Sequence, residues 1–76
     1  MGLEARRAPG AIVSTYRSAG GHTVTFDDHW NYVVRAHGTT ERSRGSAAGI
    51  GVGPLAAARL LRAHGLNWER VVEVKA

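Results

Sequence analysis

The segment that most constrains the fold is residues 50–61, in which two glycines alternate with aliphatic residues before a proline and a helix-forming run. Proline is favoured at the first helical position, because its missing N–H would have no partner there. Glycine adopts backbone conformations that other residues avoid. The segment therefore predicts a tight turn that opens into a helix beginning at Pro54. The free N–H groups of such a helix end attract anions, and phosphate above all.

The predicted helix spans residues 54–64. Its apolar positions recur at helical spacing, and Gly65 with Leu66 behind it is typical of a left-handed helix end. Arg59 and Arg62 lie on another face of this helix.

Three strands are predicted before the helix, in a β-meander over residues 11–37. The segments 11–17 and 22–26 are rich in β-branched and aromatic residues, and the segment from His29 or Trp30 to Ala36 alternates between two faces. Short turns at residues 18–21 and 27–28 make neighbouring strands antiparallel. Thr23, Thr25, Asn31 and Arg35 share the polar face.

The remaining segments carry weaker signals. Residues 1–10 are interpreted as a flexible basic tail, and residues 38–53 as a loop rich in Gly and Arg without apolar periodicity. Residues 67–75 are rich in valine and favour a strand, although Asn67 is equally suited to cap a short helix.

These elements predict one small α+β domain over residues 11–76, in the order β-β-β-α-β. An antiparallel sheet of three to four strands carries one helix packed on one face. The predicted core comprises Val24, Phe26, Trp30, Tyr32, Val34, Leu60, Leu61 and Trp68. One helix over one small sheet provides little core, so a homodimer is a plausible arrangement.

Length and charge limit the function. Seventy-six residues suit a binding module better than a catalytic cleft. The net charge is +4, and every basic residue except Lys75 is arginine, whose planar fork binds phosphate with two parallel hydrogen bonds. The charge indicates a polyanionic partner, although a bias toward Arg, Ala, Gly and Val across the chain would also produce it.

Other classes of protein, such as disulfide-linked, membrane-spanning, secreted or catalytic ones, have little support in the sequence. There is no cysteine, so disulfides and thiolate chemistry are excluded. No apolar run has the length of a membrane span, and the start of the chain lacks the apolar core of a signal peptide. We expect a soluble, cytoplasmic protein that is not an enzyme and uses no cofactor. His22, Asp27, Asp28, His29 and His37 gather at the sheet ends without the spacing of a metal site.

The order aliphatic-Gly-aliphatic-Gly-Pro, followed by Ala57 and Leu60-Leu61, resembles the hairpin and second helix of the helix-hairpin-helix DNA-binding motif. In that family the hairpin N–H groups contact phosphates without reading sequence, and a small residue at the position of Ala57 allows close helix packing. The resemblance implies that the backbone of Gly51, Val52, Gly53 and the first turn of the helix faces phosphate. Arg59 or Arg62 would then assist as a cation. The family also has a first helix before its hairpin, and residues 39–48 contain almost no large apolar residue to build one. A generic anion-binding helix start and an ordinary loop-to-helix entry remain open as alternatives.

The sequence thus predicts a small nucleic-acid-binding protein, with DNA as the favoured partner and contacts mainly to the phosphate backbone. Arginines of the polar sheet face and of the loop would add contacts to those of the helix start. The candidate nucleic-acid-binding residues are Arg17, Arg35, Arg42, Arg44, Gly51, Gly53, Arg59 and Arg62. The alternative is a protein-interaction or regulatory module, with a homodimer among its forms, without nucleic-acid activity.

Overall fold

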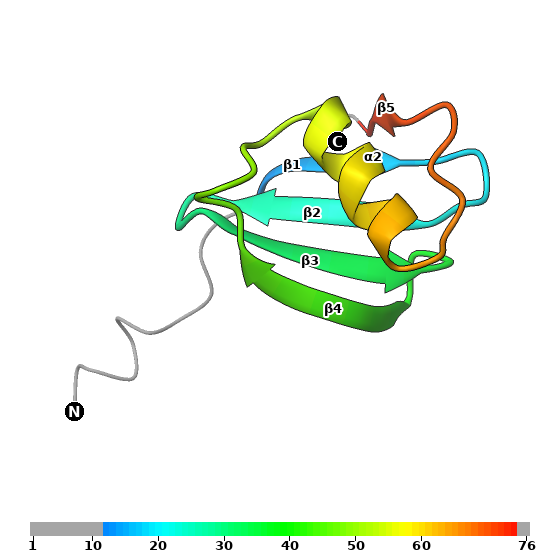
Figure 1. Ribbon diagram of the computed structural model, residues 1–76, viewed down its shortest axis with the longest axis horizontal. Coiled ribbons are helices and arrows are strands. Elements are labelled where there is room, and N and C mark those ends of the chain that lie inside the picture. The colour runs from blue at the N-terminus through cyan, green and yellow to red at the C-terminus, as the bar shows by residue number, and fades with distance from the viewer. Residues whose placement is uncertain (1–11, 75–76) are drawn as a thin grey trace.

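The computed structural model describes residues 12–74, which form one antiparallel sheet and one helix (Figure 1). The elements are β1 (Ile12–Arg17), β2 (Thr23–Asp27), β3 (Asn31–Ala36), β4 (Thr40–Ser46), α2 (Pro54–Ala63) and β5 (Val72–Glu73). The strand order is β4-β3-β2-β1-β5, and every pairing is antiparallel. For residues 12–74, this confirms the α+β class with a single helix. The predicted N-terminal tail lies outside the described residues.

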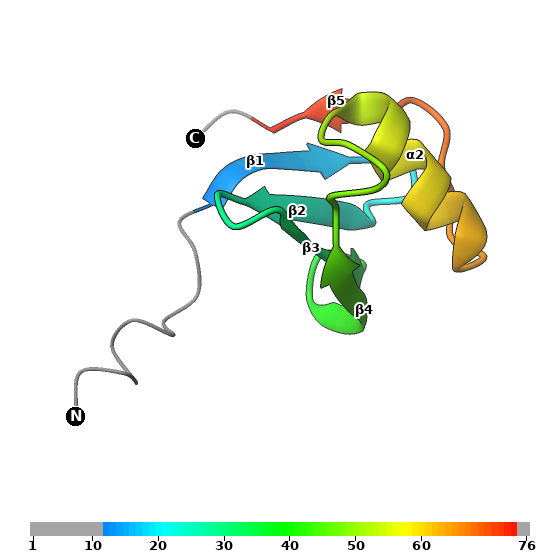
Figure 2. The same cartoon turned by 60° about the vertical axis from the view of Figure 1, so that its left-hand side comes forward.

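The core lies between α2 and one face of the sheet (Figure 2). Phe26, Val24 and Val34 are fully buried on this face, and Leu61 covers them from the helix. Side chains of a strand alternate between the two faces, so the residues next to these point to the opposite side. That second face carries no helix or strand from residues 12–74, and we call it the open face.

The prediction of a loop over residues 38–53 is wrong for its first half, because residues 40–46 form the edge strand β4. Its residues Thr-Glu-Arg-Ser-Arg-Gly-Ser lack apolar alternation, so the sequence gives no strand signal. A tight turn starts β4: His37 and Gly38 both have positive φ, and the N–H of Thr39 donates to the carbonyl of Ala36 at 3.1 Å. Both features are typical of the turns that join hairpin strands.

Position 45 on β4 requires glycine, because the side chain of Tyr32 on β3 lies across it. Tyr32 is paired with Gly45, and a Cβ atom built on Gly45 would lie 2.9 Å from the Tyr32 hydroxyl oxygen. The phenol ring therefore fills the space that a side chain on β4 would occupy. A large apolar residue, the usual mark of a core strand, has no room at this position.

Trp30 and Trp68 were predicted in the core, and both predictions are wrong. The Asp27 carboxylate accepts the N–H groups of His29 and Asn31, so the chain turns at residues 28–30 and leaves Trp30 57% exposed. Trp68 is 45% exposed, because β5 begins only at Val72 and the preceding residues form a connecting loop. The core instead contains an aromatic that was not predicted there, Tyr16. Its ring packs edge-on against that of Phe26, with the ring centres 5.9 Å apart.

The start and end of α2 match the local signals. Gly53 precedes the helix with a φ of 145°, Pro54 is at its first turn, and no side chain caps it. At the other end, Gly65 has a φ of 71° and donates to the carbonyl of Arg62, while Leu66 donates to that of Leu61. This hydrogen-bond pair is the Schellman motif, in which glycine accepts the left-handed conformation.

We expect Leu61→Ala to lower the free energy of unfolding by about 3 kcal/mol, because it empties a fully buried site between helix and sheet. Leu55→Ala is the matched control, since Leu55 is on the same helix but 66% exposed. It should change the stability by less than about 0.5 kcal/mol. Urea unfolding of both variants measures the difference, and equal losses would contradict this description of the core.

We expect Asp27→Ala to lower the melting temperature, because it removes the acceptor of two backbone N–H groups. The hydrogen bonds from Asn31 and then His29 lower the pKa of Asp27 from its ordinary value of 3.8. A lowered folded-state pKa means that this stabilisation is present above the unfolded pKa and is lost as pH falls through the folded one. Asp27→Asn keeps an oxygen acceptor, so it should retain more stability at neutral pH and lose this part of the acid dependence. Thermal melts between neutral pH and about pH 2 test both outcomes.

Candidate nucleic-acid interface

Two cross-strand rows of side chains make up the middle of the open face. Residues directly opposite each other on paired strands share a face, so the register defines both rows. The first row contains Arg17, Thr23, Arg35 and Glu41, and the second contains Thr15, Thr25, Val33 and Arg44. Three of the predicted binding arginines, which are distant in the sequence, are thus brought onto one surface.

Arg17 and Arg35 lie on either side of β2. Each is opposite Thr23, and neighbouring strands are about 4.8 Å apart, so the two arginine backbones are about 10 Å apart. Arg17 is exposed and Arg35 is half-buried. Within residues 12–74, neither forms an ion pair with an acidic side chain. Arg35 nevertheless lies opposite Glu41, and after the hydrogen bond from Arg44 its charge also contributes to the lowered pKa of that carboxyl group.

Arg44 already has an acidic partner. Its Nη2 and Nε atoms donate to the two carboxylate oxygens of Glu41 at 2.6 and 2.7 Å. This forked contact lowers the pKa of Glu41 and raises that of Arg44, in each case chiefly through the side-chain hydrogen bond. Both groups are exposed to water, so a phosphate can compete for the same guanidinium.

Arg42 is at an irregularity of the sheet edge. The register of β3 and β4 shifts between Val34 and Arg35, and Arg42 is the extra residue on β4. A bulge of this kind places two residues opposite one and bends the strand. The bulge explains how Glu41 and Arg44, three positions apart, both occupy the open face. Arg42 itself is exposed.

The helix start is separated from these arginines by the sheet. The N–H of Gly51, predicted to face phosphate, instead donates to the carbonyl of Ala47 at 2.8 Å. That prediction is therefore wrong for this N–H group. Gly53 remains at an uncapped helix end with no acidic residue in the first turn. Its surroundings are apolar, with Val52 and Leu55 both exposed.

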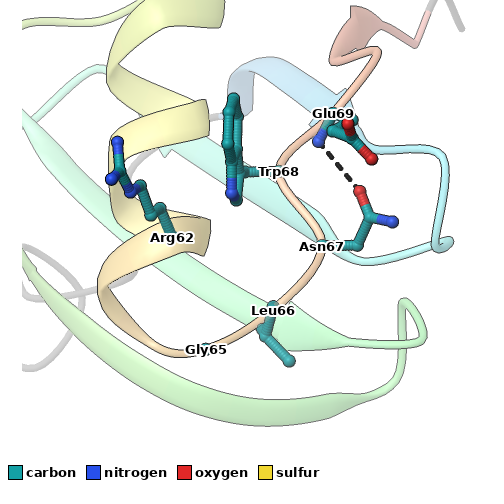
Figure 3. Close-up of a pocket in the computed structure, with 6 residues that line it drawn as sticks. All are labelled: Arg62, Gly65, Leu66, Asn67, Trp68 and Glu69. Carbon is teal, nitrogen blue, oxygen red and sulfur yellow. Dashed lines mark hydrogen bonds between the residues drawn. The ribbon is translucent and has the colours of Figure 1, made fainter.

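Arg59 and Arg62 lie on the exposed side of α2. The Arg62 guanidinium carbon is 5.5 Å from the centre of the Trp68 ring, which is within range of a cation–π contact. Figure 3 shows this pair beside an open hollow at the end of α2, bordered by residues 65–69. Arg62 thus covers an aromatic ring of its own chain. The candidate residues therefore form two groups, one on the open face and one on the helix layer.

The histidines and acidic residues of the sheet ends do not converge. The Nδ1 atom of His22 accepts the N–H of His37, with their rings 4.7 Å apart, and His29 contacts Asp28 at 3.6 Å. Among residues 12–74 no three such side chains are grouped as a metal site would require. No helix in this part of the chain is long and apolar enough to cross a membrane.

Comparison with known proteins adds no relative. No protein-family model, curated protein or solved structure matches the chain. The residues before the Gly-rich hairpin form β4, so within residues 12–74 the first helix of the helix-hairpin-helix family has no counterpart. The resemblance is confined to the hairpin and the helix that follows it.

Proposed function

We propose that this chain binds double-stranded nucleic acid, with DNA as the preferred duplex, through the open face of its sheet. The observation that carries the proposal is the alignment of Arg17 and Arg35 in one cross-strand row, on the face that α2 leaves uncovered. Arginine on a flat, hydrated surface is suited to phosphate, because its planar fork forms two parallel hydrogen bonds.

The dimensions of the row support a duplex partner. The arginine backbones are about 10 Å apart, and the major groove of B-DNA is about 12 Å wide. Arg17 and Arg35 can therefore reach phosphates on the two sides of a groove. Thr23 lies between them and is buried, and the next row carries Thr15 and Thr25, whose hydroxyl oxygens are 3.3 Å apart. Such small hydroxyl side chains approach a groove closely and bond to phosphates or base edges.

The composition of the open face favours a duplex over a single strand. Neither of its two rows contains an aromatic side chain. Sequence-tolerant binding of single strands relies on bases stacking on aromatic rings. Trp68, one of the exposed aromatics of the described chain, lies in the loop after α2 and is partly covered by Arg62. The sheet therefore offers charge and hydrogen bonds without a stacking platform.

The decisive comparison is between two double variants that remove the same charge from different layers. Arg17→Gln/Arg35→Gln alters the open face and keeps part of each aliphatic stem, whereas Arg59→Gln/Arg62→Gln alters the helix layer. Binding to random-sequence duplex DNA is measured over a range of salt concentrations. Because each lost phosphate contact reduces the slope of log K against log salt by about 0.9, the first variant should reduce it by about 2. The helix variant should leave the slope near that of the parent chain. Equal effects would show that net charge alone governs binding, and no effect of either would reject the proposal.

A second prediction concerns Glu41, which holds Arg44 and also lies opposite Arg35. Glu41→Gln removes the carboxylate that competes with phosphate, so it should tighten duplex binding and increase the salt slope by about 0.9. Glu69→Gln is the matched control, because Glu69 is an exposed acid on the loop after α2. The same tightening in both variants would mean that Arg44 has no local part in binding.

A further inference from the structure

The second row of the open face contains an aliphatic side chain in a surface that is otherwise polar. Val33 is half-buried between Thr25 of β2 and Arg44 of β4. It is not among the residues of the core, which lies on the other face of the sheet. The methyl groups of Val33 are therefore directed away from the hydrophobic contacts that hold the fold together.

The residues beside Val33 in this row are also branched at Cβ. Thr25 and Thr15 follow on β2 and β1, and both are half-buried. Their hydroxyl oxygens are 3.3 Å apart, so one of the two hydroxyls already donates within the sheet. Each threonine also carries a methyl group on the same carbon as its hydroxyl. We call Thr15, Thr25 and Val33 the methyl row.

The methyl row lies next to the arginines that carry the proposed function. On β1, Thr15 is two positions from Arg17. On β3, Val33 is two positions from Arg35, and such residues are about 7 Å apart along a strand. The two arginine strands flank β2 (Figure 1), so phosphates bound by both arginines would set the groove between them over β2 and Thr25. The methyl row would then face the edges of the bases.

The chemistry of the methyl row selects one base. In the major groove thymine presents a C5-methyl group, with which a threonine methyl makes apolar contact, whereas guanine, adenine and cytosine are read by charged or amide side chains. The methyl row has no guanidinium, amide or carboxylate group. Its short side chains also allow the strands to approach a groove closely. Thymine is therefore the base that this row fits.

We propose that the methyl row contacts the C5-methyl group of thymine, so that the open face prefers DNA duplexes containing A·T pairs. This inference rests on the proposed function and adds base selection to its phosphate contacts. It also gives a reason for DNA as the preferred duplex, because RNA carries uracil, which lacks that methyl group, and its major groove is too narrow for side chains to read.

The test compares duplexes that differ by a methyl group. An A·T-rich DNA duplex is made with thymine or with uracil throughout, and a G·C duplex is made with cytosine or 5-methylcytosine, which places a methyl group in the same groove. The parent chain should bind each methylated duplex more tightly, by about fourfold for each methyl contact, as expected for burying one such group. The salt slopes of each pair should be equal, because the phosphate contacts do not change.

Two double variants separate the methyl groups from the hydroxyls. Thr15→Ser/Thr25→Ser removes two methyl groups and keeps the hydroxyls, so it should lose most of the preference while binding the uracil duplex like the parent. Thr15→Val/Thr25→Val keeps methyl groups, removes the hydroxyls and suits a strand, so it should retain the preference. Thr39→Ser is the matched control, because Thr39 is an exposed threonine of the β3–β4 turn, and it should bind like the parent.

The outcomes distinguish this inference from the proposed function. Equal binding of thymine and uracil duplexes by the parent, with the salt slope still dependent on Arg17 and Arg35, would reject the thymine contact alone. A full preference in the serine variant would also reject it, because the preference would then come from the shape of the DNA. Failure to bind any of the duplexes would reject the proposed function and the thymine contact together.

Discussion

The packing of Leu61 against Phe26, Val24 and Val34 is the contact on which the rest of the structure depends. Successive strand residues point to opposite faces, so fixing these inward positions also fixes every outward one. A shift of one residue in any strand would exchange the two faces. The same hydrophobic contact that stabilises the fold therefore decides which arginines share the open face.

The molecule divides its surface chemistry as a result. The open face has arginine and threonine side chains in register across its strands. The arginines of α2 lie on the other side of the sheet, and one of them, Arg62, is over Trp68. Along the strands, the end with Arg17 and Arg35 is basic, and the end with Trp30 is apolar and acidic.

The arginines of the candidate site could be named from the sequence, but their arrangement on the sheet could not. The arginine content of the sequence indicates phosphate binding, because no other basic side chain can donate two parallel hydrogen bonds to a phosphate group. The grouping of Arg35 with Arg17 depends on strand pairing over 18 positions, which no local pattern reveals. The sequence predicts a loop at Arg44, because β4 carries Gly45 against the Tyr32 ring in place of an apolar residue. Likewise, the sequence predicts that the N–H of Gly51 faces phosphate, because its hydrogen bond to the Ala47 carbonyl forms only when the turn closes.

Local patterns along the chain were enough to predict the helix from Pro54 to its glycine end, the first three strands and the α+β class. These follow from backbone preferences and from the spacing of apolar residues, which act within a few positions of the chain. Three features became visible only in the folded chain: β4 completes the sheet, Trp30 and Trp68 remain outside the core, and the arginines divide between two layers. The physical reason is that burial and register are set by partners distant in the chain, which a local pattern does not contain.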